Sequence, residues 1–224
     1  MRSSKRKFIW LYLLAATFTN QTTLAVNLDA TEGTEIRQML ESRIAKIGNN
    51  KALKQRMARE GLDRTVLCRS CHGDDGMAIQ PLVPNLAGQN PVYIVDQFQR
   101  FGDGRRYDYL MSNLAKTFSL EDKIKIAIFY SDMEMKPSGG GIPELLEEGK
   151  LLFKKRCVEC HGENGRGQAG YALLAGQRYD YIVKMLKEFR DRTGRRTNVW
   201  MSGVAVRLNN RDIKAVATYL ANLE

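Results

Sequence analysis

The sequence predicts an all-α protein built from two similar helical domains, and three observations support that prediction. Apolar residues recur at helical spacing, and no segment alternates apolar and polar residues as a half-buried strand would. The segment Leu86-Ala87-Gly88-Gln89 returns 88 residues later as Leu174-Ala175-Gly176-Gln177. The length of 224 residues leaves room for about two small domains. We therefore expect the tandem duplication of one small domain.

Each copy of the repeat predicts a middle helix and a last helix. Pro91 to Phe101 and Arg178 to Phe189 are expected to form the middle helices, each of which ends near a glycine. Ser119 to Tyr130 is expected to form the last helix of the first copy, with Ser119 as its N-cap, and Asn209 to Leu223 its counterpart.

The domain limits follow from composition. The Gly- and Pro-rich segment 137–143 predicts a linker. The two domains are then expected at residues 61–136 and 144–224.

The first 60 residues lie outside this repeat. Residues 1–25 have a basic start, a short apolar run and a small-residue cleavage site, which predicts a cleaved secretory signal peptide; an uncleaved anchor is the alternative. Residues 26–60 predict a helical extension, because one face is apolar. That face packs on the first domain or binds a partner, and its residues are Ile36, Met39, Leu40, Ile44 and Ile47.

Two pentapeptides use all four cysteines and both histidines of the chain. Cys-x-x-Cys-His is the attachment signature of a c-type haem, in which the two thiols bond to the haem and the histidine binds its iron. We expect two covalently bound haem c groups. The residues of the two signatures are Cys68, Cys71 and His72, and Cys157, Cys160 and His161.

Zinc and a redox disulfide are the alternatives for two Cys-x-x-Cys pairs. The cysteine pairs of zinc sites are usually separated by about 15 to 20 residues. Here they lie 89 residues apart, and each is followed by a histidine at the same position. A thioredoxin-like disulfide needs a βαβ context, which this sequence does not offer. Haem attachment is therefore the favoured interpretation.

The sixth iron ligand cannot be a histidine from the same chain, because the two signatures use both. Methionine is the next choice and is associated with raised reduction potentials. Of the nine methionines, Met111 and Met201 match each other in the repeat, 39 and 40 residues after their histidines. We expect both to lie in loops just before a helix and to reach the iron. An open or lysine-ligated iron remains the alternative.

Charge is distributed unequally along the chain. The formal net charge is +10, of which the predicted signal peptide carries four, leaving +6 on the mature chain. Residues 61–138 carry −1 and residues 139–224 carry +5. Nucleic-acid binding is disfavoured, because no aromatic-basic motif appears in an exported chain. An acidic redox partner facing the second domain fits better.

From residue 61 to 224 the chain resembles the dihaem cytochrome c4 family. The resemblance rests on the paired haem signatures, on Leu-Ala-Gly-Gln after each, and on a methionine eight residues before the cap of a last helix. It implies two tandem class I cytochrome c domains that face each other with haem propionates at the interface. It also implies iron ligation by His72 with Met111 and by His161 with Met201.

The resemblance implies a periplasmic carrier of electrons between respiratory partners, towards a terminal oxidase, without substrate chemistry of its own. Its partners would be a membrane-bound reductase or terminal oxidase, and the carrier would be either soluble or loosely associated with the membrane. Four arginines, Arg105, Arg106, Arg195 and Arg196, are candidates for pairing with propionates or with partner carboxylates, and a solvated basic turn is equally compatible.

Two other functions stay open. The first is a dihaem subunit of a larger oxidoreductase, such as a flavocytochrome c sulfide dehydrogenase, with the extension as the interface to the flavoprotein. The second is a catalytic or gas-sensing cytochrome with an open iron, against which the Met111/Met201 symmetry counts.

One departure from the family concerns the loop after each signature. A proline whose carbonyl orients the proximal histidine usually precedes Leu-Ala-Gly-Gln; Pro84 fits, whereas Ala172 replaces it in the second copy. An alanine carbonyl can still accept that hydrogen bond. We expect the second loop to be the more mobile of the two.

Overall fold

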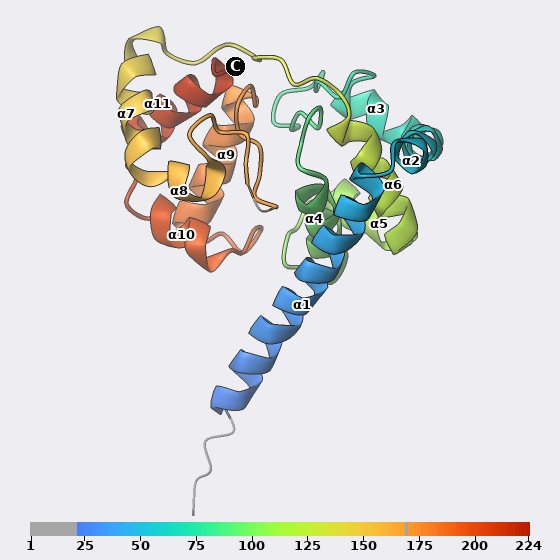
Figure 1. The fold of residues 1–224 in the computed structure, drawn as a ribbon. Coiled ribbons are helices and arrows are strands. Elements are labelled where there is room, and N and C mark those ends of the chain that lie inside the picture. Colours follow the sequence, from blue (N-terminus) through green and yellow to red (C-terminus); the bar gives the residue numbers. More distant parts are fainter. Residues whose placement is uncertain (1–21, 169) are drawn as a thin grey trace, which may run out of the picture. The chain divides into compact units, whose positions relative to one another are not determined.

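The computed structural model confirms the all-α prediction (Figure 1). It describes residues 22–168 and 170–224, with side chains from residue 35 onward. Most of the predicted signal peptide lies outside the described residues. The chain divides into a short unit ending at Ile36 and a large unit, Arg37–Glu224, which contains both haem signatures.

The helices described are α1 Thr22–Gly48, α2 Lys51–Arg64, α3 Val66–His72, α4 Pro91–Asp103, α5 Tyr109–Thr117, α6 Leu120–Ser131, the 3-10 helix η1 Pro143–Leu145, α7 Leu146–Arg156, α8 Val158–His161, α9 Tyr179–Asp191, α10 Val199–Ala205 and α11 Asn210–Ala221. We call residues 51–131 the first half and residues 143–224 the second half. The domain limits expected from the sequence remain a prediction.

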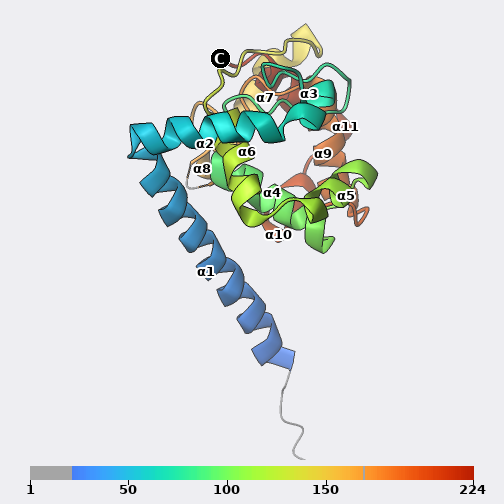
Figure 2. The ribbon, with the colours of Figure 1, turned by 90° about the vertical axis from the view of Figure 1, so that its right-hand side faces the viewer.

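Each half is built around a close crossing of two helices at a glycine. A Cβ atom added to Gly61 of α2 would lie 2.2 Å from the carbonyl oxygen of Lys125 in α6. Figure 2 shows α2 running across α6. A Cβ atom on Gly149 of α7 would lie 2.0 Å from the carbonyl oxygen of Ala215 in α11. Only glycine allows so close an approach. Because both crossings place such a glycine against the last helix of its half, α2 and α7 are equivalent. The helix of the first half that corresponds to α7 therefore begins at Lys51.

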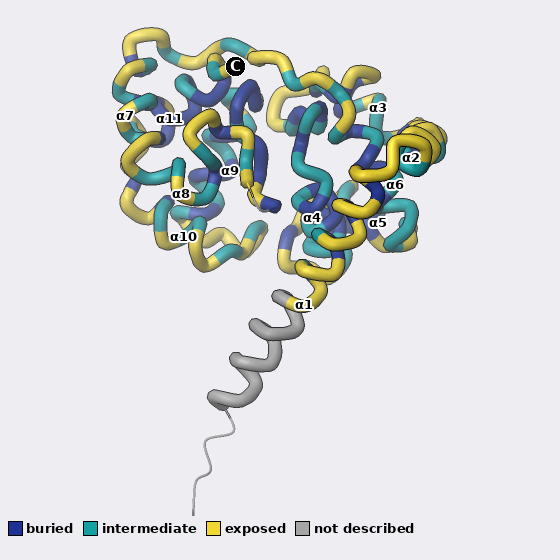
Figure 3. The backbone as a smooth tube through the Cα atoms, viewed as in Figure 1, coloured by how far each residue is buried: buried dark blue, intermediate teal, exposed yellow. Residues whose placement is uncertain are grey.

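Two apolar clusters come mainly from α4 and α6 in the first half and from α9 and α11 in the second, where Figure 3 shows many buried residues. Phe98, Ile124 and Tyr130 belong to the cluster of the first half, and Phe153, Ile213 and Leu220 to that of the second. The last helices begin as predicted: the Ser119 side chain accepts from the backbone N–H of Asp122, and Asn209 forms a capping box with Asp212.

The segment from residue 37 to the end of α1 packs on the first half. Leu40, Ile44 and Ile47 are buried in its cluster, whereas Met39 is half exposed. These three residues of the amphipathic face therefore pack on the first half, which was one of the two alternatives. Among the described residues, no helix is both long and apolar enough to cross a membrane.

The two halves meet through backbone as well as side chains. Arg106 and Arg196 form an isolated antiparallel bridge, and the N–H of Tyr107 donates to the carbonyl of Arg195 at 2.7 Å. The connecting segment lies along the second half, where the N–H of Gly139 donates to the carbonyl of Ala221 at 2.9 Å.

Candidate haem sites

His72 ends α3 and is buried and held by one hydrogen bond. Its Nδ1 lies 2.8 Å from the carbonyl oxygen of Pro84. Because a carbonyl can only accept, Nδ1 carries the proton and Nε2 has a free lone pair for a metal. Burial lowers the pKa of His72 despite that hydrogen bond, so the ring is held neutral.

His161 at the end of α8 is held in the same way. Its Nδ1 lies 2.9 Å from the carbonyl oxygen of Ala172, so the alanine carbonyl does accept the bond, as expected. Burial lowers the pKa of His161 as well. The ring of Tyr171 packs edge-on against the imidazole, with centroids 6.2 Å apart. Both histidines therefore present Nε2 as the available ligand atom.

None of the four signature cysteines forms a disulfide in the described structure. Burial raises the pKa of Cys68 and raises that of Cys157 to about 11, so both thiols are held protonated. Within residues 22–168 and 170–224, no three His, Cys, Asp or Glu side chains form a cluster that could hold a metal ion. This geometry disfavours the zinc alternative.

In the first half, the predicted haem residues line one apolar pocket. Cys68, Cys71, His72 and Met111 all line it, and most of the other lining residues are apolar. Tyr130 also lines the cavity, and its buried hydroxyl has no hydrogen-bond partner in the described structure. An apolar slot with one unpaired donor suits a flat apolar group that carries polar substituents.

Met111 and Met201 lie in similar settings in the two halves. Met111 and Cys68 both pack against the first apolar cluster, and Met201 and Cys157 both pack against the second. Each half thus has a thiol and a thioether against the same core.

The prediction that these methionines lie in loops is wrong. Met111 is in the first turn of α5 and Met201 in the first turn of α10. The side chain of Asp108 accepts from the backbone N–H of Met111 at 3.1 Å, and that of Asn198 from Met201 at 2.9 Å. An N-cap three residues before each methionine therefore starts a short helix there. The sequence contained this signal, Asp or Asn followed by a short apolar run.

The four arginines separate into a surface pair and an interior pair. Arg105 is exposed and pairs with Asp103 at 2.6 Å, and Arg195 is exposed. Arg106 is buried and Arg196 is half-buried, and neither has an ion-pair partner among the described residues.

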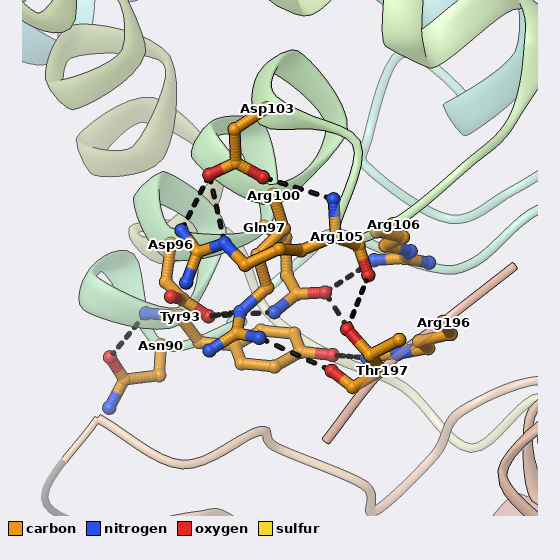
Figure 4. Close-up of polar contacts among 10 residues, drawn as sticks. All are labelled: Asn90, Tyr93, Asp96, Gln97, Arg100, Asp103, Arg105, Arg106, Arg196 and Thr197. Carbon is orange, nitrogen blue, oxygen red and sulfur yellow. Dashed lines mark hydrogen bonds and ion pairs between the residues drawn. The ribbon is translucent and has the colours of Figure 1, made fainter. Parts of the chain in front are cut away.

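The interior pair donates to neutral oxygens, and Figure 4 shows Gln97 and Tyr93 next to the two arginines. Arg106 donates to Gln97 at 2.8 Å and to the Tyr181 hydroxyl at 2.7 Å. Arg196 donates to Gln97 at 3.2 Å, to the Tyr181 hydroxyl at 3.3 Å and to the Tyr93 hydroxyl. Burial would raise the pKa of Tyr181, but the two guanidinium charges lower it. In the described structure, the interface of the halves therefore carries two arginines that pair directly with no carboxylate.

Comparisons with known proteins extend these observations. The family model described as cytochrome c matches residues 146–224. Cytochrome c4 from Azotobacter vinelandii is 32% identical over 189 residues, which cover 74% of this chain and 89% of that protein. The chain belongs to the cytochrome c4 family. The crystal structure of reduced recombinant cytochrome c4 from Pseudomonas stutzeri superposes with a TM-score of 0.68 at 32% identity, covering 75% of this chain and 98% of that one.

A further relative has a more specific description. The thiosulfate dehydrogenase electron acceptor of Thiomonas intermedia is 33% identical over 171 residues, which cover 69% of this chain and 77% of that protein.

Membership of the cytochrome c4 family makes this chain a dihaem electron-transfer protein with two haem c groups. The residues present fit that group: each half offers two thiols, a neutral histidine with free Nε2 and a thioether. The unpaired Tyr130 hydroxyl and the uncompensated charge of Arg106 and Arg196 suit anionic propionates.

Proposed function

We propose that this cytochrome carries electrons through two irons with His/Met ligation, His72 with Met111 and His161 with Met201. The thioether attachments would be Cys68 and Cys71, and Cys157 and Cys160. The observation that carries the proposal is the shared cavity of the first half, which His72 and Met111 both line with the two cysteines. When bound, each haem supplies a one-electron iron couple.

The residues of the chain tune and position that couple. The carbonyls of Pro84 and Ala172 fix the histidine tautomers, at 2.8 and 2.9 Å. The apolar clusters exclude water from the sites, and methionine ligation raises the potential. Iron held by both a histidine and a methionine would leave no position for a substrate.

We further propose that the protein works in the periplasm, between a membrane-bound reductase and a terminal oxidase. The predicted signal peptide supports export. The net charge of +5 on residues 139–224 supports docking of an acidic partner surface there.

A second function is favoured by one comparison. The relative from Thiomonas intermedia is an electron acceptor of thiosulfate dehydrogenase, so this chain would take electrons from a sulfur-oxidising enzyme. In this second function the protein again works with a larger oxidoreductase. That enzyme would be a thiosulfate dehydrogenase and not the sulfide-oxidising flavoprotein considered from the sequence.

Stopped-flow kinetics separate the two functions. The ferrous protein is mixed with oxidase-containing membranes, and the ferric protein with purified thiosulfate dehydrogenase and thiosulfate. Rapid oxidation by the membranes, weakened by added salt, supports the respiratory carrier. Rapid reduction by the dehydrogenase with slow oxidation by the membranes supports the second function. If neither reaction is faster than with an unrelated cytochrome, both partner assignments fail.

A further inference from the structure

Gln89 and Gln177 end the two copies of Leu-Ala-Gly-Gln, and neither contributes a group to the iron. Both are almost fully buried, with 4% and 3% of their surface exposed. A buried amide needs hydrogen-bond partners for both its donor and its acceptor. Each glutamine finds these partners in the other half of the molecule.

The amide of Gln89 pairs with both backbone groups of Leu173. Its Nε2 donates to the carbonyl of Leu173 at 2.9 Å, and its Oε1 accepts from the N–H of Leu173 at 2.7 Å. The same Oε1 accepts from the N–H of Asn90, the N-cap residue of α4, at 3.0 Å.

The amide of Gln177 makes the reciprocal set of bonds. Its Nε2 donates to the carbonyl of Asn85 at 3.0 Å, and its Oε1 accepts from the N–H of Asn85 at 2.8 Å. Its Oε1 also accepts from the N–H of Arg178, the residue before α9, at 3.0 Å. The two glutamines therefore make four hydrogen bonds across the halves, and we call Gln89 and Gln177 the glutamine clamp.

The clamp acts on the peptide groups that hold the proximal histidines. The N–H of Asn85 and the carbonyl of Pro84 belong to one peptide group, and so do the N–H of Leu173 and the carbonyl of Ala172. One hydrogen-bond chain thus runs from His72 through peptide 84–85 to Gln177. The other runs from His161 through peptide 172–173 to Gln89.

We propose that Gln89 and Gln177 are positioning residues that tune the haem of the opposite half. A hydrogen bond accepted from a peptide N–H polarises that planar group and makes its carbonyl a stronger acceptor. A stronger acceptor at Nδ1 makes the imidazole a better electron donor to iron, which favours the ferric state. The effect is crossed, so Gln177 lowers the potential of the haem at His72, and Gln89 that of the haem at His161.

The inference rests on the proposed ligation by His72 and His161, and the test uses two matched variants of the holoprotein. Gln177→Met and Gln89→Met keep the side-chain length and remove the hydrogen bonds. Backbone amide exchange of the ferrous protein is measured by NMR, and each haem is titrated through its own resonances. In Gln177→Met, the protection of the Asn85 amide falls roughly tenfold and that of Leu173 stays unchanged. The potential of the haem at His72 rises.

Gln89→Met gives the mirror result, with protection lost at Leu173 and a raised potential at the haem of His161. A shift confined to the haem of the mutated half, an equal shift of both haems, or no shift overturns the inference.

If Gln177→Met does not fold, Gln177→Glu takes its place. Its carboxylate still accepts from the N–H of Asn85, so the protection of that amide is retained. The potential of the haem at His72 then shifts downward more than that of the haem at His161. A larger shift at the haem of His161 overturns the proposal.

Failure of the ligation is distinguishable from failure of the clamp. Wild-type protein without histidine–methionine spectra would overturn the ligation before any variant is made. Wild-type spectra of that kind, together with uncrossed shifts, would overturn the clamp alone.

Discussion

In the first half, the carbonyl that holds the proximal histidine belongs to Pro84, whereas in the second half it belongs to Ala172. The two hydrogen bonds differ by only 0.1 Å, from 2.8 to 2.9 Å. The second loop also makes a contact with a residue far away in the sequence. The guanidinium of Arg37 lies 5.1 Å from the centroid of the Tyr171 ring, which packs against His161. A local restraint in one half is thus replaced by tertiary packing in the other.

The walls of the two sites also differ. The carbonyl of Tyr130 accepts from the N–H of Gly88, and the carbonyl of Leu220 accepts from the N–H of Gly176, so the two residues are equivalent. Tyr130 brings to the first site a buried hydroxyl that has no hydrogen-bond partner in the described structure. In the second half, the equivalent Leu220 has only a hydrocarbon side chain. The duplicated frame therefore gives two unequal environments, and we expect two different potentials.

The largest effect is expected from the axial methionines. Met111→Ala should remove the methionine–iron charge-transfer band of the first haem only, and Met201→Ala that of the second only. The potential of the affected haem should fall by on the order of 100 mV. The half-exposed Met39 is the matched control, since Met39→Ala should leave both bands intact. If neither axial variant changes the spectrum, the ligand assignment is wrong.

A smaller effect is expected from the buried charge at the interface. Replacing Arg106 by Met removes a positive charge that favours the reduced iron, so the first haem's potential should fall by about 50 mV. Arg105→Met removes an exposed arginine that pairs with Asp103, and should change neither potential measurably. Equal shifts in the two variants, measured by redox titration, would refute a special role for the interior pair.

The Tyr130 hydroxyl should act on one haem alone. If it donates to a propionate of the first haem, Tyr130→Phe should lower that potential by about 40 mV. The exposed Tyr107 provides the control variant Tyr107→Phe. An unchanged first potential in a folded Tyr130→Phe protein would show that the hydroxyl does not tune the site.

The smallest effect concerns the second proximal loop. Ala172→Pro should stabilise the protein by roughly 0.5 to 1 kcal/mol, because proline restricts the unfolded chain and, among the described contacts, the N–H of Ala172 donates no hydrogen bond. Ala172→Gly should lower the stability. Thermal unfolding of the holoprotein measures both, and a destabilised Ala172→Pro variant would show that this loop differs in backbone from that of Pro84.

The helical class, the duplication and the haem signatures were predictable because each leaves a local pattern in the sequence. Ser119 and Asn209 could be named as caps since capping depends on residues three positions apart. The start of α2 at Lys51 and its crossing with α6 at Gly61 could not be predicted. The crossing depends on the close approach of two backbones, which leaves no pattern in the residues around the glycine.

Contacts between the halves were also beyond the sequence. Nothing near Gln89 indicates that its amide pairs with Leu173, 84 residues away. Likewise, Arg105 and Arg106 are neighbours of the same type, and only tertiary packing makes one exposed and the other buried. The repeated Leu-Ala-Gly-Gln did mark the glutamines as matched, but not what they bind.

The most direct test of the account is near-infrared magnetic circular dichroism of the ferric wild-type protein, with the haem content determined on the same sample. The account predicts two haems per chain, both low-spin, with methionine–iron charge-transfer intensity that corresponds to two sites. A five-coordinate signal from either haem, or charge-transfer intensity of only one site, would contradict it.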